Sequence, residues 1–192
     1  MEYKLPPAVV RTLREPAPTA ADFRPTKFTP ADTKAWFASH FLRFVSSDFP
    51  EHQFTKRFYS QVMHTFSFIA HYDRDGFWTE YFTNTAGKIE FIEQVMQHPC
   101  YGDPGHTFSD VEREIRQRLR QVELLDFYRT KNRAEQEAAD RAQFARLKAR
   151  FEPDGATLQD SLAQTAAVRV IAQAGTRSPP FVQGASQLAF AL

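Results

Sequence analysis

Cysteine and glycine are scarce in this sequence of 192 residues. Cys100 is the only cysteine, which excludes an internal disulfide and any zinc site built from several thiolates. The first of the seven glycines is Gly76, and their spacing matches neither a dinucleotide-binding motif nor a phosphate-binding loop. These absences argue against a Rossmann enzyme and against a P-loop NTPase.

Long apolar runs are also missing. The longest unbroken apolar run covers residues 188–192, whereas a membrane span needs about 18 or more apolar residues. Pro6 and Pro7 stand where a secretory signal would carry its apolar region. We therefore expect a cytoplasmic protein with no membrane partner.

Neither sign of charge dominates the chain. It has 24 Lys and Arg against 23 Asp and Glu, a formal net charge of +1. Hydrophobic residues make up 42% and charged residues 24%, as in ordinary soluble globular proteins. The strongly basic composition that is typical of nucleic-acid-binding domains is absent, and the length fits one domain with tails.

Phenylalanine, in contrast, is abundant. The chain has 19 phenylalanines, and 12 of them lie between Phe28 and Phe91. Each fully buried Phe contributes about 1.5–3 kcal/mol, so this segment is predicted to supply the core. Apolar residues recur there at helical spacing, as Phe37, Phe41 and Phe44 do. The pattern predicts an all-α fold of four or five helices around a Phe-rich core.

We expect three parts along the chain. Residues 1–28 hold five prolines and show no helical periodicity, which predicts an extended arm. Residues 153–192 carry few charges and many alanines, which predicts a weak helix ending near Gly175 and then a tail. Between them, residues 29–152 are predicted to form the helical domain. Its first helices are expected at 29–49, at 51–71, across 77–82, and from 84 or 85 onward.

One long helix is predicted at 109–151. Ser109 and Glu112 have the spacing of a capping box, and no proline or glycine interrupts the helix. Its middle, residues 129–143, lacks large apolar side chains, and opposite charges four residues apart favour a solvated helix there. The last two turns regain an apolar face, which we expect to contact this domain, a second copy or another protein. That face consists of Phe144, Leu147 and Phe151.

The final residues form a second apolar candidate for partner binding. They follow the segment 176–180, which has the composition of a linker. An apolar end behind a linker is typical of a short motif that binds a groove on another protein. Docking on this protein's own domain is the alternative. The apolar side chains concerned are Leu188, Phe190 and Leu192.

Two groups of histidines invite a catalytic or metal-binding hypothesis. His64 and His71 lie seven residues apart on one predicted helix, and Asp75 follows, so a metal-dependent hydrolase could use all three. Zinc-binding helices usually pair histidines three or four residues apart, which favours a polar helix edge instead. We therefore assign no metal ligand here.

The second group lies in one short loop. His98, Cys100 and His106 fall within nine residues, together with Asp103, and could gather around a metal ion or form a nucleophile with its base. No Lys or Arg adjoins Cys100 to stabilise its thiolate. A structured connection is the favoured interpretation, and we expect no cofactor.

Cations along the predicted long helix are the third candidate site. Arg113, Arg116 and Arg120 are predicted to share one face, where they could bind phosphates or an acidic protein surface. Carboxylates lie among them and would repel a phosphate backbone, which favours the protein surface. A further cluster of cations follows one or two turns later and consists of Arg129, Lys131 and Arg133.

No residue set in the sequence forms a convincing active site. The leading hypothesis is a non-enzymatic interaction protein, an adaptor or inhibitor that docks on a larger assembly; a role in a mobile element or against host defence would fit this class. The alternative is a nucleic-acid-associated accessory protein that uses the arginines, and the third is the hydrolase. We also expect self-association, because an apolar helix end is awkward in water unless it is covered.

Overall fold

The computed structural model describes residues 4–66, 73–97 and 102–151. Within these residues it contains seven α-helices, two short 3-10 helices and no strand, which confirms the predicted all-α fold. The chain divides into two compact units, residues 1–138 and 139–192. The second unit is described here only over residues 139–151, where it consists of helix.

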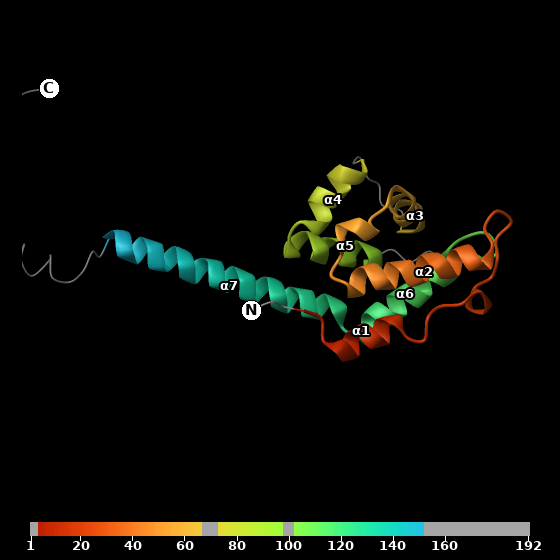
Figure 1. Ribbon diagram of the computed structural model, residues 1–192, viewed down its shortest axis with the longest axis horizontal. Coiled ribbons are helices and arrows are strands. Elements are labelled where there is room, and N and C mark those ends of the chain that lie inside the picture. Colours follow the sequence, from red (N-terminus) through yellow and green to blue (C-terminus); the bar gives the residue numbers. More distant parts are fainter. Residues whose placement is uncertain (1–3, 67–72, 98–101, 152–192) are drawn as a thin grey trace, which may run out of the picture. The chain divides into compact units, whose positions relative to one another are not determined.

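The helices follow one another with short connections (Figure 1). In chain order they are α1 (Pro7–Arg14), η1 (Ala20–Asp22), α2 (Ala31–Ser46), η2 (Glu51–Gln53), α3 (Lys56–Phe66), α4 (Arg74–Phe82), α5 (Thr85–Gln97), α6 (Ser109–Gln121) and α7 (Leu124–Phe151).

Helix α2 is the central element of the first unit. Helices α1 and α6 and the 3-10 helix η1 all pack against it, and α4 packs against α5. Pro30 precedes α2, and the helix ends before Pro50, as the sequence predicts. Phe49 leaves the helical conformation with a positive φ of 57° and still buries its ring in the core.

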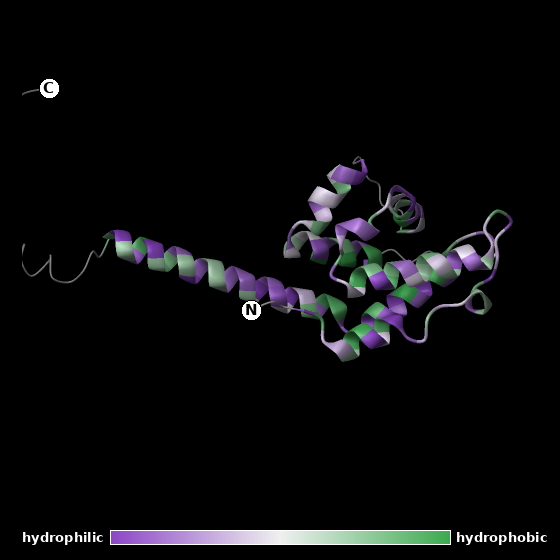
Figure 2. Cartoon of the chain, in the orientation of Figure 1, coloured by the Kyte–Doolittle hydropathy of each residue, from purple (hydrophilic) through white to green (hydrophobic). Residues whose placement is uncertain are grey.

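The Phe-rich core forms as predicted. Rings from α2, α3, α4 and α5 meet mostly edge to face or tilted, as Phe44 and Phe58 do with centroids 5.2 Å apart, while Phe41 and Phe91 stack; such ring pairs add to the free energy of burial. Figure 2 shows the green, hydrophobic faces of these helices among purple, hydrophilic ones. The phenylalanines without measurable exposure are Phe37, Phe41, Phe44, Phe54, Phe58, Phe77 and Phe91.

Phe28 is an exception, because 86% of its surface is exposed. It lies in a tight turn in which the Thr26 N–H donates to the Thr29 carbonyl at 2.9 Å. The Thr29 N–H in turn donates to the Thr26 hydroxyl at 2.8 Å. Phe28, the first phenylalanine of the segment predicted to supply the core, therefore lies outside the core, at a turn held by local hydrogen bonds.

The predicted extended arm contains a helix, which corrects the sequence-based expectation. Pro7 opens α1, and a proline fits the first helical position because its missing N–H would have no partner there. Val9 packs against the core and Leu13 is fully buried. Farther along the arm, Phe23 is buried as well. Burial of these residues on α2 and α6 stabilises a helix that is too short to be stable alone.

The long helix predicted at 109–151 is two helices, α6 and α7. Glu123 between them has a φ of 50°, which breaks the helix without proline or glycine. Leu119 and Leu124 are both buried in the core. In a straight helix, five residues would place them about 140° apart. The break lets both point into the same core.

The predicted capping box at the start of this helix is also wrong. Phe108 is the N-cap, and the Ser109 hydroxyl donates to the Gly102 carbonyl at 2.6 Å. Glu112 forms an ion pair with Arg116. The count of seven helices exceeds the predicted four or five, because α1 was not expected and the long helix is divided.

Candidate functional site

The predicted row of arginines on α6 does not form one exposed face. Arg113 and Arg120 are exposed, but only 3% of Arg116 is exposed. Its Nε donates to the Val95 carbonyl at 2.5 Å, and its guanidinium pairs with the buried Glu112. Arg116 thus ties α6 to the end of α5, and the phosphate-binding row would lack its central member.

The second predicted cluster is divided in the same way. Arg129 donates to Glu93 at 2.8 Å, a hydrogen bond that raises the pKa of the arginine. Lys131 is buried, with its Nζ 3.7 Å from an oxygen of Asp48. Arg133 is exposed. Two of the three cations therefore serve contacts inside the first unit.

The Asp48 carboxylate, just after α2, interacts with three side chains from two helices: Lys88 of α5, and Tyr128 and Lys131 of α7. Its Oδ1 accepts hydrogen bonds from the Tyr128 hydroxyl at 2.8 Å and from the Lys88 Nζ at 2.9 Å. Burial, together with the Asp48 charge, raises the pKa of Tyr128 above that of a free tyrosine. Asp48 has a positive φ of 61°, and the cluster links the end of α2 to α5 and to the start of α7.

Lys34 is a buried cation that the sequence analysis did not single out. Its side chain has no exposed surface, and its Nζ donates to the carbonyls of Pro104 and Thr107 and to the Asp110 carboxylate at 2.8–3.1 Å. All three ammonium protons thus have acceptors. The sequence does carry a signal for the burial of Lys34, because this residue lies three positions before Phe37 and so on the apolar face of α2.

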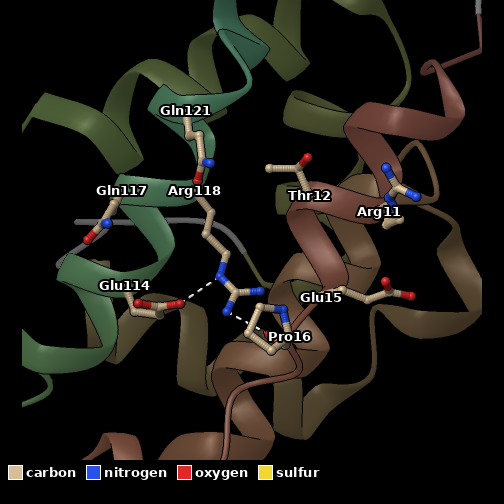
Figure 3. A pocket seen from close by; sticks show the side chains of 8 residues that line it. All are labelled: Arg11, Thr12, Glu15, Pro16, Glu114, Gln117, Arg118 and Gln121. Carbon is tan, nitrogen blue, oxygen red and sulfur yellow. Dashed lines mark hydrogen bonds and ion pairs between the residues drawn. The ribbon is translucent and has the colours of Figure 1, made fainter.

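A polar hollow of about 490 Å³ lies between α1 and α6 (Figure 3). Arg118 occupies its centre and donates to Glu114 at 2.6 Å and to the carbonyls of Leu13 and Pro16 at 3.1 and 2.7 Å. These bonds hold the N-terminal arm on α6. The hollow is lined by Arg11, Thr12, Glu15, Pro16, Glu114, Gln117, Arg118 and Gln121. The most buried cation of this hollow, Arg118, joins the N-terminal arm to α6. The polar groups of the hollow therefore serve helix packing.

A smaller hollow of about 340 Å³ lies along α2. The guanidinium of Arg57 stands 4.3 Å from the Trp36 ring centroid, and the rings of Trp36 and His40 stack with centroids 5.4 Å apart. A ring nitrogen of His40 lies 3.0 Å from the Gln53 carbonyl. These contacts of Arg57, Trp36 and His40 join α2 to α3, so the His40 ring is held by packing.

The histidine groups gain no support as a catalytic site. His64 is exposed, beside the edge of Phe108, and Asp75 pairs with Arg74. His71 lies outside the described residues. Among the residues that are described, no three His, Cys, Asp or Glu side chains come together as a metal site would require.

The loop group is described only in part. His98 and Cys100 lie outside the described residues, and His106 is exposed. The Asp103 carboxylate accepts from the Gly105 N–H at 2.8 Å, a bond that lowers its pKa. It also pairs with Arg24 at 3.1 Å. Asp103 therefore shapes the loop and fastens the arm to it.

The apolar residues predicted near the end of α7 are exposed. The exposed fractions are 68% for Phe144, 44% for Leu147 and 70% for Phe151. Their spacing of three and four residues places them on one face of the helix, and we call these three residues the α7 stripe. Apart from Phe28, they are the large apolar side chains that the described part of the chain exposes most.

Cations alternate with the α7 stripe along the sequence. Residues 141–151 contain four of them and no carboxylate, and the guanidinium of Arg150 lies 5.4 Å from the Phe151 ring centroid. In Figure 2, α7 is green at its start, mostly purple in its middle and greener again near its end. The four cations are Arg141, Arg146, Lys148 and Arg150.

The remaining predicted partner residues, Leu188, Phe190 and Leu192, lie outside the described residues. None of the described helices combines the length and the apolar content needed to cross a membrane. No protein-family model matches the chain, and neither a curated protein nor a solved structure matches it.

Proposed function

We propose that this protein is a non-enzymatic interaction module, an adaptor or inhibitor that docks on a larger assembly through α7. The observation that carries the proposal is the α7 stripe, with two aromatic rings about 70% exposed on one helix face. Large aromatic side chains dominate the energetics of protein interfaces. Fully burying a Phe or Leu contributes about 1.5–3 kcal/mol each, so covering the stripe supplies substantial affinity.

The interior of the first unit supports the same proposal. Its buried charges, such as Lys34 and Arg116, are each satisfied by carbonyls and carboxylates of neighbouring elements. Such groups stabilise a fold when every donor is paired. These charges therefore serve packing inside the first unit, which leaves the α7 stripe as the candidate binding surface.

The test compares two triple variants of the full chain. The first, Phe144→Ser, Leu147→Ser and Phe151→Ser, removes the α7 stripe. The control, Ala142→Ser, Ala145→Ser and Ala149→Ser, has the same spacing and also lies at exposed positions, but it faces another side of the helix. Ala→Ser lowers helix propensity more than Phe→Ser or Leu→Ser does, so loss of helix alone would affect the control at least as much as the stripe variant.

The measurement is quantitative cross-linking and affinity capture from the native host. Wild-type protein and the control should retain the same stoichiometric partner, and the stripe variant should lose it. Equal retention by both variants would refute a binding role for the α7 stripe. Circular dichroism confirms that both variants keep the helical content of the wild type.

A further inference from the structure

We infer that the partner of α7 presents an apolar groove edged by carboxylates, which receives residues 141–151 as a helix. The inference rests on the proposed function and specifies the chemistry of the partner. It starts from two observations on the same segment: the α7 stripe is exposed, and four cations and no anion accompany it.

The size of the α7 stripe argues for a groove over a flat surface. Two Phe and one Leu side chains can bury at most roughly 600 Å² in total, whereas a stable interface buries about 800 Å² on each partner. A partner that touches only the stripe therefore covers too little surface. A groove also covers the flanks of the helix, including the alkyl stems of its cations, and so reaches the required area.

The charge of the segment decides between a second copy and a different partner. All charges between residues 141 and 151 are positive. Parallel pairing of two copies would place each cation near its own counterpart, and antiparallel pairing centred on Leu147 would bring the two Lys148 side chains close together. Like charges across an interface oppose association. A carboxylate edge on the partner removes this repulsion.

The residues just before the α7 stripe argue against a lipid surface. Asp140 lies four residues before Phe144, on the same helix face, and it is exposed. An anionic membrane lying along that face would repel this carboxylate. A groove that receives only residues 141–151 covers about 16 Å of helix and therefore ends before Asp140.

The probe for the experiment is Ca²⁺-loaded calmodulin, an acidic protein whose Met-rich groove takes up amphipathic helices. Full-length protein is titrated into it by calorimetry at low and at high salt. Besides the two serine variants above, the set includes Arg150→Gln, because Arg150 lies three residues after Leu147 on the flank of the stripe, whereas Arg146 shares the face of the control alanines. Arg141 and Lys148 interact with other residues of the chain and are left intact.

We expect saturable binding that weakens at least about tenfold in the stripe variant and is unchanged in the Ala→Ser control. The arginine variant should lose roughly three- to tenfold in affinity and part of the salt dependence. No detectable binding of the wild type to calmodulin at the highest concentration tested, or an arginine variant that binds as tightly as the wild type, would overturn the carboxylate edge.

Two parallel measurements test the other occupants. Binding of phosphatidylserine vesicles that depends on the α7 stripe and exceeds binding to calmodulin would replace the groove with a lipid surface. A dimeric mass in sedimentation equilibrium that the stripe variant abolishes would replace it with a second copy. If the stripe variant loses the host partner but the arginine variant keeps it at all salt concentrations, the proposed function stands and this inference fails.

Discussion

Replacing Arg116 with alanine should destabilise the fold strongly, whereas the same replacement at Arg113 should not. Both residues lie on α6, three positions apart, and the sequence predicts the same exposed face for both. In the structure, only 3% of Arg116 is exposed, while Arg113 is exposed. The two substitutions are thus matched in chemistry and differ in burial.

The magnitude follows from the contacts that Arg116 makes. Its loss removes the hydrogen bond to the Val95 carbonyl at 2.5 Å and leaves Glu112, also 3% exposed, without its ion-pair partner. Breaking a buried ion pair by removing one member costs about 3–5 kcal/mol. With about 2–4 °C per kcal/mol for a chain of this size, Tm should fall by roughly 6–20 °C. An exposed substitution such as Arg113→Ala stays within about 0.5 kcal/mol.

Urea and thermal denaturation followed by far-UV circular dichroism measure both effects. A double variant, Glu112→Leu with Arg116→Met, removes both charges and should recover at least half of the loss, since replacing a buried ion pair by apolar residues of similar volume is often neutral. If Arg116→Ala and Arg113→Ala differ by less than about 1 kcal/mol, then Arg116 is solvated, and the predicted phosphate-binding row becomes tenable again.

Three further predictions test the fold. Gly87→Ala should cost about 1–3 kcal/mol in urea denaturation, because the new Cβ would lie 2.4 Å from the backbone oxygen of Glu80; a stabilised variant would contradict this packing. Phe28→Ser should change stability by less than about 0.5 kcal/mol and Phe37→Ala by about 3–5 kcal/mol, so equal losses would refute the burial assignments. Because the pKa of Tyr128 is raised above 10.0 in the folded state, the native state holds this proton more tightly, and the free energy of unfolding should fall as pH rises past about 10; the Tyr128→Phe variant should lose less over that range, and identical pH profiles would contradict the shift.

Local sequence patterns sufficed to predict the helices that bury one apolar face. The stripe of Phe37, Phe41 and Phe44 has helical spacing, and all three are buried as expected. The preceding helix ends at Ser46, a few residues before Pro50 and close to the predicted end. In these places the signal lies within a few residues and does not depend on the rest of the chain.

Tertiary packing decided the elements that the sequence did not predict. Helix α1 has only eight residues and depends on burial of Leu13 and on the bond from Arg118 to the Leu13 carbonyl. The break at Glu123 is required because buried leucines on either side must reach one core. The break at Glu123 has no proline or glycine at its position, and the one local signal of α1 is Pro7 at its first helical position.

The buried charges on α6 had a partial signal in the sequence. Glu112 and Arg116 stand four residues apart, each directly after an apolar residue of the predicted stripe. A helix packed on two sides buries a face wider than that stripe, so these positions enter the core. Their opposite charges make burial tolerable, because each satisfies the other.

Because some of the predicted cations are buried, the candidate binding surface lies at the end of α7 and not on α6 or at the start of α7. Arg116 and Lys131 are buried and Arg129 pairs with Glu93, so α6 and the start of α7 present a broken set of positive charges mixed with carboxylates. Residues 141–151 present cations alone, beside the exposed α7 stripe. Apolar side chains supply affinity, and charges of one sign supply selectivity and speed of association. Because this segment combines the two over three apolar side chains on one helix face, it is where we expect a partner to bind first.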